Sequence, residues 1–372
     1  MLWCSIIPYM PLVLYRKHRP QSFKDIVGQE HVVRTVTSAI AANDFAHSYL
    51  FAGPRGTGKT TLARLVAKAI NCERRAVGQY EPCGKCNSCD EISRGVAVDL
   101  IEMDAASNRG IDEIRQLKEG IRFTPTRTKY KVFIIDEVHM LTKEAFNALL
   151  KTLEEPPAHA VFVLATTEIN KVIPTIISRS QKFEFRKLFH KEIRDRLLLV
   201  TKREGKSVDS KILDLVASRA AGSVRDAESM LGQILSLGDS AEFEDAQFLL
   251  GCTGFETISR FVESLTSGNK KEAIMLVSKV VEKGVDPDQF IKGVLGYVRW
   301  MMFLKIDKGL GEIVGREISK DELTQLETHT LQFEMPQLQK TAELFLTASN
   351  NMKYSPIPEL PIEMAIVELL ES

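Results

Sequence analysis

One stretch of this sequence decides the fold: Gly53-Pro54-Arg55-Gly56-Thr57-Gly58-Lys59-Thr60. A glycine, four further residues and then Gly-Lys-Thr is the spacing of a phosphate-binding loop. The glycines let backbone N–H groups point at phosphate oxygens, and the helix that follows adds the positive end of its dipole. Lys59 can reach the β- and γ-phosphates, and the Thr60 hydroxyl can ligate Mg²⁺. The predicted ATP-binding residues of this segment are Gly53, Pro54, Arg55, Gly56, Thr57, Gly58, Lys59, Thr60 and Thr61.

The flanking sequence favours a parallel α/β sheet. Ser48–Ala52 is a short apolar run typical of a buried strand, and 61–70 carries helical periodicity. Further β-rich apolar runs alternate with helical segments, as in sheets covered on both faces. These expected strands are 98–103, 131–135, 161–165 and 181–185.

Two pairs of polar residues follow strands of this sheet. Asp136 and Glu137 end an apolar strand, and the carboxyl ends of parallel strands meet at the phosphate loop. Asp136 is expected to help hold Mg²⁺, and Glu137 to activate the attacking water. Thr166 and Thr167 end the next strand, where a hydroxyl can hold that water. The alternatives are acids that cap the next helix and threonines that merely close a strand.

Two arginines are candidate phosphate ligands. Arg179 lies in Ser178-Arg179-Ser180, just before the last strand, and Arg225 lies in Gly222-Ser223-Val224-Arg225-Asp226. An arginine that touches the γ-phosphate stabilises the charge of the transition state. Taken alone, each could equally be a surface ion-pair residue.

Four cysteines form a candidate metal site. Cys72, Cys83, Cys86 and Cys89 lie in one short stretch, with two residues between each of the last three. Four thiolates suit tetrahedral Zn²⁺ with no open coordination position, which makes the site structural. An iron–sulfur cluster and four free thiols are the alternatives. Cys4 and Cys252 stand alone and carry no predicted role.

Composition bounds the remaining possibilities. The 372 residues allow two or three domains, and Lys plus Arg equal Asp plus Glu at 49 each. Nucleic-acid contact would therefore come from a local patch. Arg115, Lys118 and Arg122 share one face of an expected helix over 111–122 and could follow a phosphate backbone, although a solvated face is as good a reading. No apolar run is long enough for a membrane span, so a cytoplasmic location is expected.

Beyond the sheet, the pattern is helical. Helices are expected over 192–201, 210–220 and 224–237, followed by a polar linker at 238–244 and further helices to the end. An apolar stripe is expected at Ile274, Val277 and Val281, and Pro356, Pro358 and Pro361 are expected to precede a terminal helix. The expected boundaries are an N-terminal extension 1–14, an α/β domain 15–187 with the cysteine module 72–89, a helical domain 188–244 and a helical domain 245–372.

Together these motifs resemble the AAA+ ATPases, and more narrowly the clamp-loader ATPases of the bacterial DNA polymerase III gamma/tau family. Tyr15-Arg16-Lys17-His18-Arg19-Pro20 and Val27-Gly28-Gln29 are similar to that family's N-terminal signature, which lies near the adenine. Asn147-Ala148-Leu149-Leu150-Lys151 and Glu154-Glu155-Pro156-Pro157 also match, and the resemblance covers the chain from about residue 12. It implies an AAA+ ATPase domain with a zinc insert, a small helical lid and an all-α collar.

The resemblance also implies roles and partners. Tyr15, Arg19 and Val27 would lie near the base, Arg179 would act in trans on a neighbour's ATP, and Arg225 would sense ATP in its own chain. The cofactors would be ATP, Mg²⁺ and Zn²⁺. The partners would be other clamp-loader subunits in a homo- and hetero-oligomeric pentamer, the sliding clamp, primer–template DNA, and the polymerase core where a tail continues.

The implied activity is ATP-driven opening and loading of the clamp during DNA replication. Such a subunit would be classed with DNA-directed DNA polymerase, although no polymerase carboxylate pair is apparent in this chain. One departure from the family is Ser180, where Ser-Arg-Cys is usual. The alternatives are another AAA+ motor, such as a Holliday-junction translocase, and a non-hydrolysing adapter subunit.

Overall fold

The computed structural model describes residues 13–238, 242–250, 254–282, 284–315, 318 and 320–371. The chain divides into two compact units. Unit 1 joins the residues up to Gly205 with Arg219–Gly232, and unit 2 joins Lys206–Ser218 with the residues from Gln233 onward. Each unit has its own apolar core.

A five-stranded parallel sheet organises unit 1, in the order β2-β3-β4-β1-β5. Crossovers through helices place every strand's carboxyl end at the same edge, which is where parallel sheets bind ligands. Ala52 of β1 pairs with Thr166 of β4, and Asp104 of β2 pairs with Asp136 of β3. The strands are β1 (Ser48–Ala52), β2 (Leu100–Asp104), β3 (Lys131–Asp136), β4 (Ala160–Thr166) and β5 (Gln181–Glu184).

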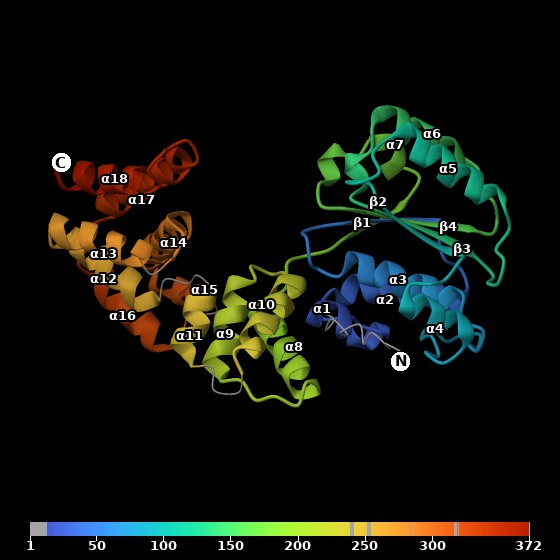
Figure 1. Cartoon of the computed structure of the whole chain (residues 1–372), viewed down its shortest axis with the longest axis horizontal. Helices are drawn as coiled ribbons and strands as arrows, with labels where there is room; N and C mark the ends of the chain where they lie inside the picture. The colour runs from blue at the N-terminus through green and yellow to red at the C-terminus, as the bar shows by residue number, and fades with distance from the viewer. Residues whose placement is uncertain are drawn as a thin grey trace, which may run out of the picture. The chain divides into compact units, whose positions relative to one another are not determined.

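Helices cover both faces of this sheet, as Figure 1 shows. Because side chains alternate along a strand, Tyr49 and Phe51 of β1 pack on one side with α2 and α3, whereas Leu50 packs on the other with α5 and α6. Strands buried on both faces explain the continuous apolar runs of the sequence. The helices are α1 (Leu14–Lys17), α2 (Glu30–Ala42), α3 (Lys59–Ile70), α4 (Asn87–Arg94), α5 (Ile111–Arg122), α6 (Lys143–Glu154) and α7 (Pro174–Ile177).

The rest of the chain is helical. Its largest apolar cluster belongs to unit 2, where Phe261, Phe290 and Phe345 meet edge to face. The helices are α8 (His190–Arg203), α9 (Ser210–Arg219), α10 (Val224–Ser236), α11 (Phe243–Leu249), α12 (Phe255–Thr266), α13 (Lys270–Glu282), α14 (Pro287–Ile306), α15 (Gly311–Val314), α16 (Lys320–Thr330), α17 (Met335–Met352) and α18 (Leu360–Glu371).

The predicted α/β class and helical continuation are confirmed, with local differences. The strand expected at 98–103 begins only at Leu100, because the buried Asp99 carboxylate turns aside to bond backbone N–H groups at 126–128. Helix α11 already begins at Phe243, within the expected linker, of which residues 239–241 lie outside the described part. Pro361 lies inside the first turn of α18, where proline is tolerated because that N–H has no helical partner.

Helix α13 and the isolated cysteines carry two further expectations from the sequence. On α13, Val277 of the expected stripe is buried and Ile274 and Val281 are half-buried. The buried positions beside them are Ala273, Leu276 and Val280. Cys4, Cys252 and most of the extension 1–14 lie outside the described residues, and the expected domain boundaries stay a prediction.

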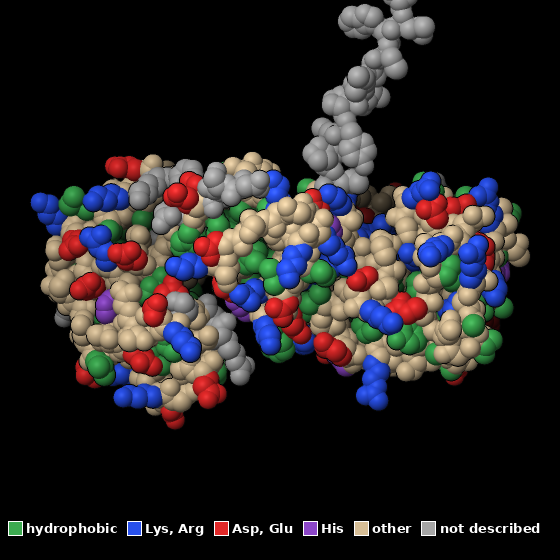
Figure 2. Space-filling view, turned by 90° about the horizontal axis from the view of Figure 1, so that it is seen from below, with side chains coloured by type: hydrophobic (Ala, Val, Ile, Leu, Met, Phe, Trp, Pro, Cys, Tyr) green, Lys and Arg blue, Asp and Glu red, His purple; other side chains and the backbone are tan. Residues whose placement is uncertain are grey.

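The surface is mixed in charge. On the face drawn in Figure 2, Lys and Arg side chains alternate with Asp and Glu, as the formal net charge of zero leads one to expect. Among the described helices, none is both long and apolar enough to cross a membrane.

Candidate nucleotide site

The phosphate loop connects the end of β1 to the start of α3. Gly53, Gly56 and Gly58 all have positive φ, at 146°, 74° and 102°, which lets the loop curl where other residues would be strained. A Cβ on Gly53 would lie 2.3 Å from the Phe185 carbonyl oxygen, so no side chain fits there. The Gly53 N–H donates to the Thr166 carbonyl at 3.1 Å, which ties the loop to β4.

Lys59 is buried at the first position of α3, with 6% of its surface exposed. Its ammonium donates to the carbonyls of Gly53 and Pro54, at 2.7 and 2.8 Å. Burial lowers the pKa of Lys59, while the carboxylates of Glu137 and Asp136 oppose that shift. The hydrogen bonds of this buried ammonium go to neutral carbonyls. A phosphate bound in the loop would add a negative charge close to it, and such a charge-assisted hydrogen bond is strong where water is excluded.

The magnesium candidates Thr60 and Asp136 lie side by side. The Thr60 hydroxyl donates to Asp136 Oδ2 at 2.8 Å, although the two residues are 76 positions apart. A hydroxyl and a carboxylate beside a phosphate loop form the oxygen donor set that Mg²⁺ prefers. These residues therefore fit the ion and would hold it, and the ion would supply positive charge that neutralises the phosphates.

Glu137 is held against the end of β4. Its Oε2 accepts the Thr167 N–H at 3.2 Å and the Thr167 hydroxyl at 2.8 Å. Glu137 itself has a left-handed backbone, with φ of 48°, where β3 ends and the next turn begins. The structure thus brings Asp136, Glu137, Thr166 and Thr167 together at the edge that carries the phosphate loop.

Helix α10 begins directly beside the phosphate loop. The Val224 N–H donates to the Gly56 carbonyl at 3.1 Å, and a Cβ on Gly56 would lie 1.9 Å from Ser223 Oγ. Gly56 is therefore required by close approach as well as by its φ. The Arg225 guanidinium lies 4.8 Å from the centre of the Tyr15 ring, so two predicted ligands far apart in sequence meet here. The Arg16 side chain lowers the pKa of Tyr15, burial opposes it, and Arg225 lowers it further.

The other N-terminal candidates lie in different surroundings. Arg19 lines a small hollow with Arg64 and Lys68 of α3, and burial and the nearby Arg64 lower its pKa. Its buried Nη1 is one of the few buried side-chain atoms in the described part that have no hydrogen-bond partner. Val27 is half-buried, and Gln29 near it exchanges hydrogen bonds with the Arg186 backbone. Gln29 was not predicted as important, although the motif Val-Gly-Gln contains it.

Arg179 makes its contacts away from the phosphate loop. Its Nη2 pairs with Glu154 Oε1 at 2.7 Å, and Nη1 donates to the Thr175 carbonyl at 2.9 Å. About a third of its side chain is exposed. Ser180, the departure from the family pattern, shares a 2.7 Å hydrogen bond with the buried Ser48. Arg179 is therefore not gathered with the other predicted site residues of its own chain.

The four cysteine sulfurs form a single cluster. All Sγ atoms of Cys72, Cys83, Cys86 and Cys89 lie within 4.8 Å of one another. Burial raises the pKa of Cys83, but N–H groups of Lys85 and Cys86 outweigh it and lower that pKa to about 6. N–H donors aimed at sulfur favour the thiolate, which is the form that binds metals. The donor set and its closeness fit Zn²⁺ or another thiophilic ion.

The expected basic face lies on α5. Arg115 is exposed and pairs with Asp112 at 3.0 Å, Lys118 is half-buried, and Arg122 is exposed. An acidic neighbour reduces the charge that this face can offer to a phosphate backbone. Contact with DNA through this helix stays a prediction.

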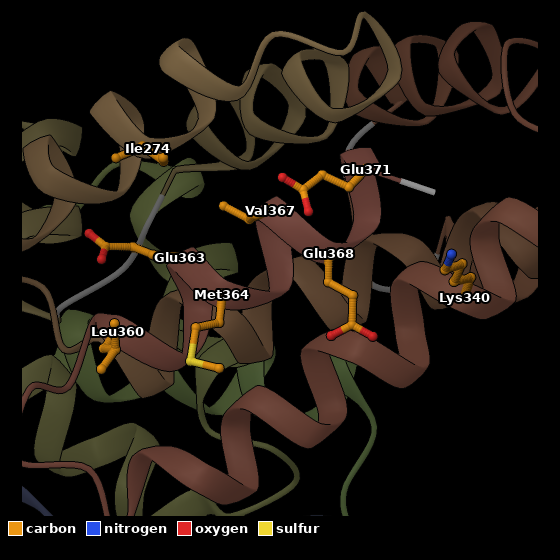
Figure 3. Close-up of a pocket in the computed structure, with 8 residues that line it drawn as sticks. All are labelled: Ile274, Lys340, Leu360, Glu363, Met364, Val367, Glu368 and Glu371. Atoms are coloured by element: carbon orange, nitrogen blue, oxygen red, sulfur yellow. The ribbon is translucent and has the colours of Figure 1, made fainter.

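Unit 2 has a groove of its own, drawn in Figure 3, with a cavity volume of about 720 Å³. Leu360, Met364 and Val367 of α18 supply apolar surface, and three glutamates stand around them. Lys340 also lines the groove, but three carboxylates against one ammonium leave its charge negative and disfavour a triphosphate. The glutamates are Glu363, Glu368 and Glu371.

A parallel sheet with a phosphate loop, an acidic β3 terminus and a polar β4 terminus is the arrangement of a P-loop ATPase. Family models narrow this further. Residues 28–189 match the family described as DNA polymerase III, delta subunit, and residues 242–372 match DNA polymerase III subunits gamma and tau domain III. The chain is 32% identical over 359 residues to DNA polymerase III subunit gamma of Buchnera aphidicola subsp. Schizaphis graminum, covering 96% of this chain and 98% of the relative. The chain therefore belongs to the bacterial DNA polymerase III gamma/tau family.

Two longer relatives support the same family membership. DNA polymerase III subunit tau of Bacillus subtilis is 40% identical over 96% of this chain, and that of Escherichia coli is 36% identical. The chain spans 63% and 55% of these two proteins. Among solved structures, Thermotoga maritima RuvB has a TM-score of 0.48 at 17% identity, covering 66% of this chain and 78% of that one. That similarity is too weak to carry an argument.

Proposed function

We propose that this chain is an ATPase subunit of a bacterial clamp loader. The observation that carries the proposal is the Thr60–Asp136 hydrogen bond, which joins the phosphate loop to the acidic end of β3 and forms a magnesium-binding pair. Lys59 and the loop N–H groups bind the phosphates, and Glu137 takes a proton from the attacking water. Bound Mg²⁺ neutralises charge on the phosphate oxygens. Intact Lys59, Thr60, Asp136 and Glu137 argue against a non-hydrolysing adapter.

Two arginines would contact bound ATP and respond to its presence. Arg225 lies in the first turn of α10 beside the loop, and its contact with Tyr15 supports a position within reach of the nucleotide. Arg179 has its partners outside the loop of its own chain, which is consistent with a role on a neighbour's ATP. In this mechanism, ATP favours an assembly of subunits that holds the sliding clamp open, and primer–template DNA completes the interfaces.

Further proposals concern the surroundings. The subunits form a pentamer in the cytoplasm, Zn²⁺ stabilises the cysteine module, and α5 follows the DNA backbone. Polymerase chemistry belongs to other subunits of the holoenzyme.

The test measures steady-state ATPase activity of the chain with the other clamp-loader subunits, with and without clamp and primed DNA. We expect strong stimulation that Lys59→Ala abolishes. Activity indifferent to clamp and primer would point instead to a different AAA+ motor, and its complete absence to an adapter.

A mixing experiment tests the action of Arg179 in trans. Chains carrying Lys59→Ala and chains carrying Arg179→Ala are each assayed alone and then together. If Arg179 acts on a neighbour, mixed assemblies contain intact interfaces and regain part of the stimulated activity. If it acted in its own chain, no mixture could regain any.

A further inference from the structure

His139 occupies the centre of the candidate catalytic edge, although no role was predicted for it. It lies in the short 3₁₀ turn Val138–Met140 that follows β3, and only 4% of its side chain is exposed. Its Nδ1 lies 3.0 Å from Thr166 Oγ1 and 3.4 Å from Glu137 Oε2. Its Nε2 lies 3.3 Å from Glu168 Oε1. The imidazole therefore stands between the ends of β3 and β4.

The hydrogen bonds around the ring restrict its orientation. Thr166 Oγ1 accepts the Glu168 N–H at 3.0 Å, and Glu137 Oε2 accepts two hydrogen bonds from Thr167. Each ring nitrogen faces a carboxylate oxygen, which a lone pair on that nitrogen would repel. Glu168 is half-exposed and pairs with Lys171, so it can turn away from Nε2, whereas Glu137 is held by Thr167 and an N–H on Nδ1 can be shared between Glu137 Oε2 and Thr166 Oγ1. The geometry thus favours Nδ1–H pointing at both oxygens.

This arrangement makes the Glu137 carboxylate depend on the ring. Glu137 is only a quarter exposed, and its left-handed backbone leaves few directions open to its side chain. Without the imidazole, the space between Glu137 and Thr166 would be open to water or to another rotamer. A general base must lie within hydrogen-bond reach of its proton, and a misplacement of about 1 Å can cost about 100-fold in rate.

We infer that His139 is a positioning residue, whose Nδ1–H joins Thr166 to Glu137 and sets the direction of the base toward the attacking water. This inference rests on the proposed role of Glu137. The Nε2 edge of the ring faces the half-exposed Glu168 and has a secondary role.

The two ring nitrogens can be tested separately. His139→Asn places an amide N–H where Nδ1 was, and His139→Gln places one where Nε2 was. Both variants, His139→Ala and wild type are assayed for kcat and KM for ATP in the complete clamp-loader mixture with clamp and primed DNA. Affinity for a fluorescent ATP analogue is measured on the chain. His159→Asn is the matched control, since that histidine precedes the opposite end of β4.

We expect His139→Ala and His139→Gln to lower kcat by roughly 10- to 100-fold with unchanged KM and analogue affinity, and His139→Asn to keep most of the rate. An unchanged kcat in His139→Ala would overturn the inference. So would equal losses in His139→Asn and His139→Gln, which would indicate packing alone. Glu137→Gln is assayed in the same series. If Glu137→Gln keeps the wild-type kcat, the proposed function is wrong. If Glu137→Gln is inactive and His139→Ala is fully active, only the role of His139 is wrong.

Discussion

At the residue scale, single side chains in this site differ in how they can be replaced. Lys59 and Asp136 are needed for their charge, and Glu137 is needed as a base. Gly56 is needed because no side chain fits at its position. The roles of Lys59 and Asp136 follow from the sequence motifs that contain them. The reason for Gly56 lies in Ser223, which occupies the space that a Cβ would need.

Glu137→Gln should separate binding from turnover. The amide keeps the shape and the Thr167 contacts but cannot take a proton, so kcat should fall by about 100-fold or more while nucleotide affinity remains. Single-turnover hydrolysis and analogue titration measure the two effects. Glu144→Gln, on the exposed start of α6, serves as the control. Equal losses of affinity and rate would mean that Glu137 acts in binding.

Asp99 should contribute stability that depends on pH. Burial raises its pKa, but N–H groups of Thr126, Arg127 and Thr128 outweigh it and lower the pKa below the ordinary value. Because the folded pKa lies below the unfolded value of about 3.9, the contribution is complete above that value and is lost as pH falls through the folded pKa.

Asp99→Asn should therefore lower the free energy of unfolding by about 1–3 kcal/mol at pH 7, and the difference from wild type should shrink as pH falls. Urea unfolding from pH 7 down to about pH 2 measures this, because the loss is expected only below about pH 3.9. Asp112→Asn, on a largely exposed carboxylate, should show no such loss. A difference independent of pH would show that charge on Asp99 does not matter.

At the element scale, local patterns gave the right elements where they were reinforced by packing. The run Lys131–Asp136 is buried on both faces as expected, and α5 has the predicted bounds. The stripe on α13 was less well predicted, because adjacent apolar residues of one helix leave two faces possible until its neighbours are known.

The cysteine module should depend on one bound metal ion. Cys86 is buried and directly precedes α4, so Cys86→Ser should remove the ion and lower the thermal midpoint of unit 1 by roughly 5 °C or more. Metal analysis and a thermal scan, with and without chelator, measure this. Lys85→Ala is the control, because it keeps the N–H that reaches Cys83. Full metal content in Cys86→Ser would contradict the four-cysteine site, and iron in place of zinc would correct the metal.

At the scale of the whole molecule, the two units should unfold separately. Each has its own apolar core, and the nucleotide candidates all belong to unit 1. Calorimetry should show two transitions. A non-hydrolysable ATP analogue with Mg²⁺, at about 100 times its Kd, should stabilise only the transition of unit 1, by about 2.7 kcal/mol.

Lys59→Ala should abolish that shift and leave the other transition where it was. A single transition that moves as a whole with nucleotide would show instead that the two units are energetically coupled.

The sequence by itself determined the α/β class, the phosphate loop, the acidic end of β3 and the cysteine cluster, because each depends on residue type at short spacing. Only the tertiary structure decided what meets across long spacing. In the folded chain, Thr60 forms a hydrogen bond with Asp136, Arg225 packs against the ring of Tyr15, and His139 lies between Glu137 and Thr166. Such contacts depend on strand order and on the close packing of the core, and a lone histidine after Asp-Glu carries no signal in the sequence that shows which oxygens it will face.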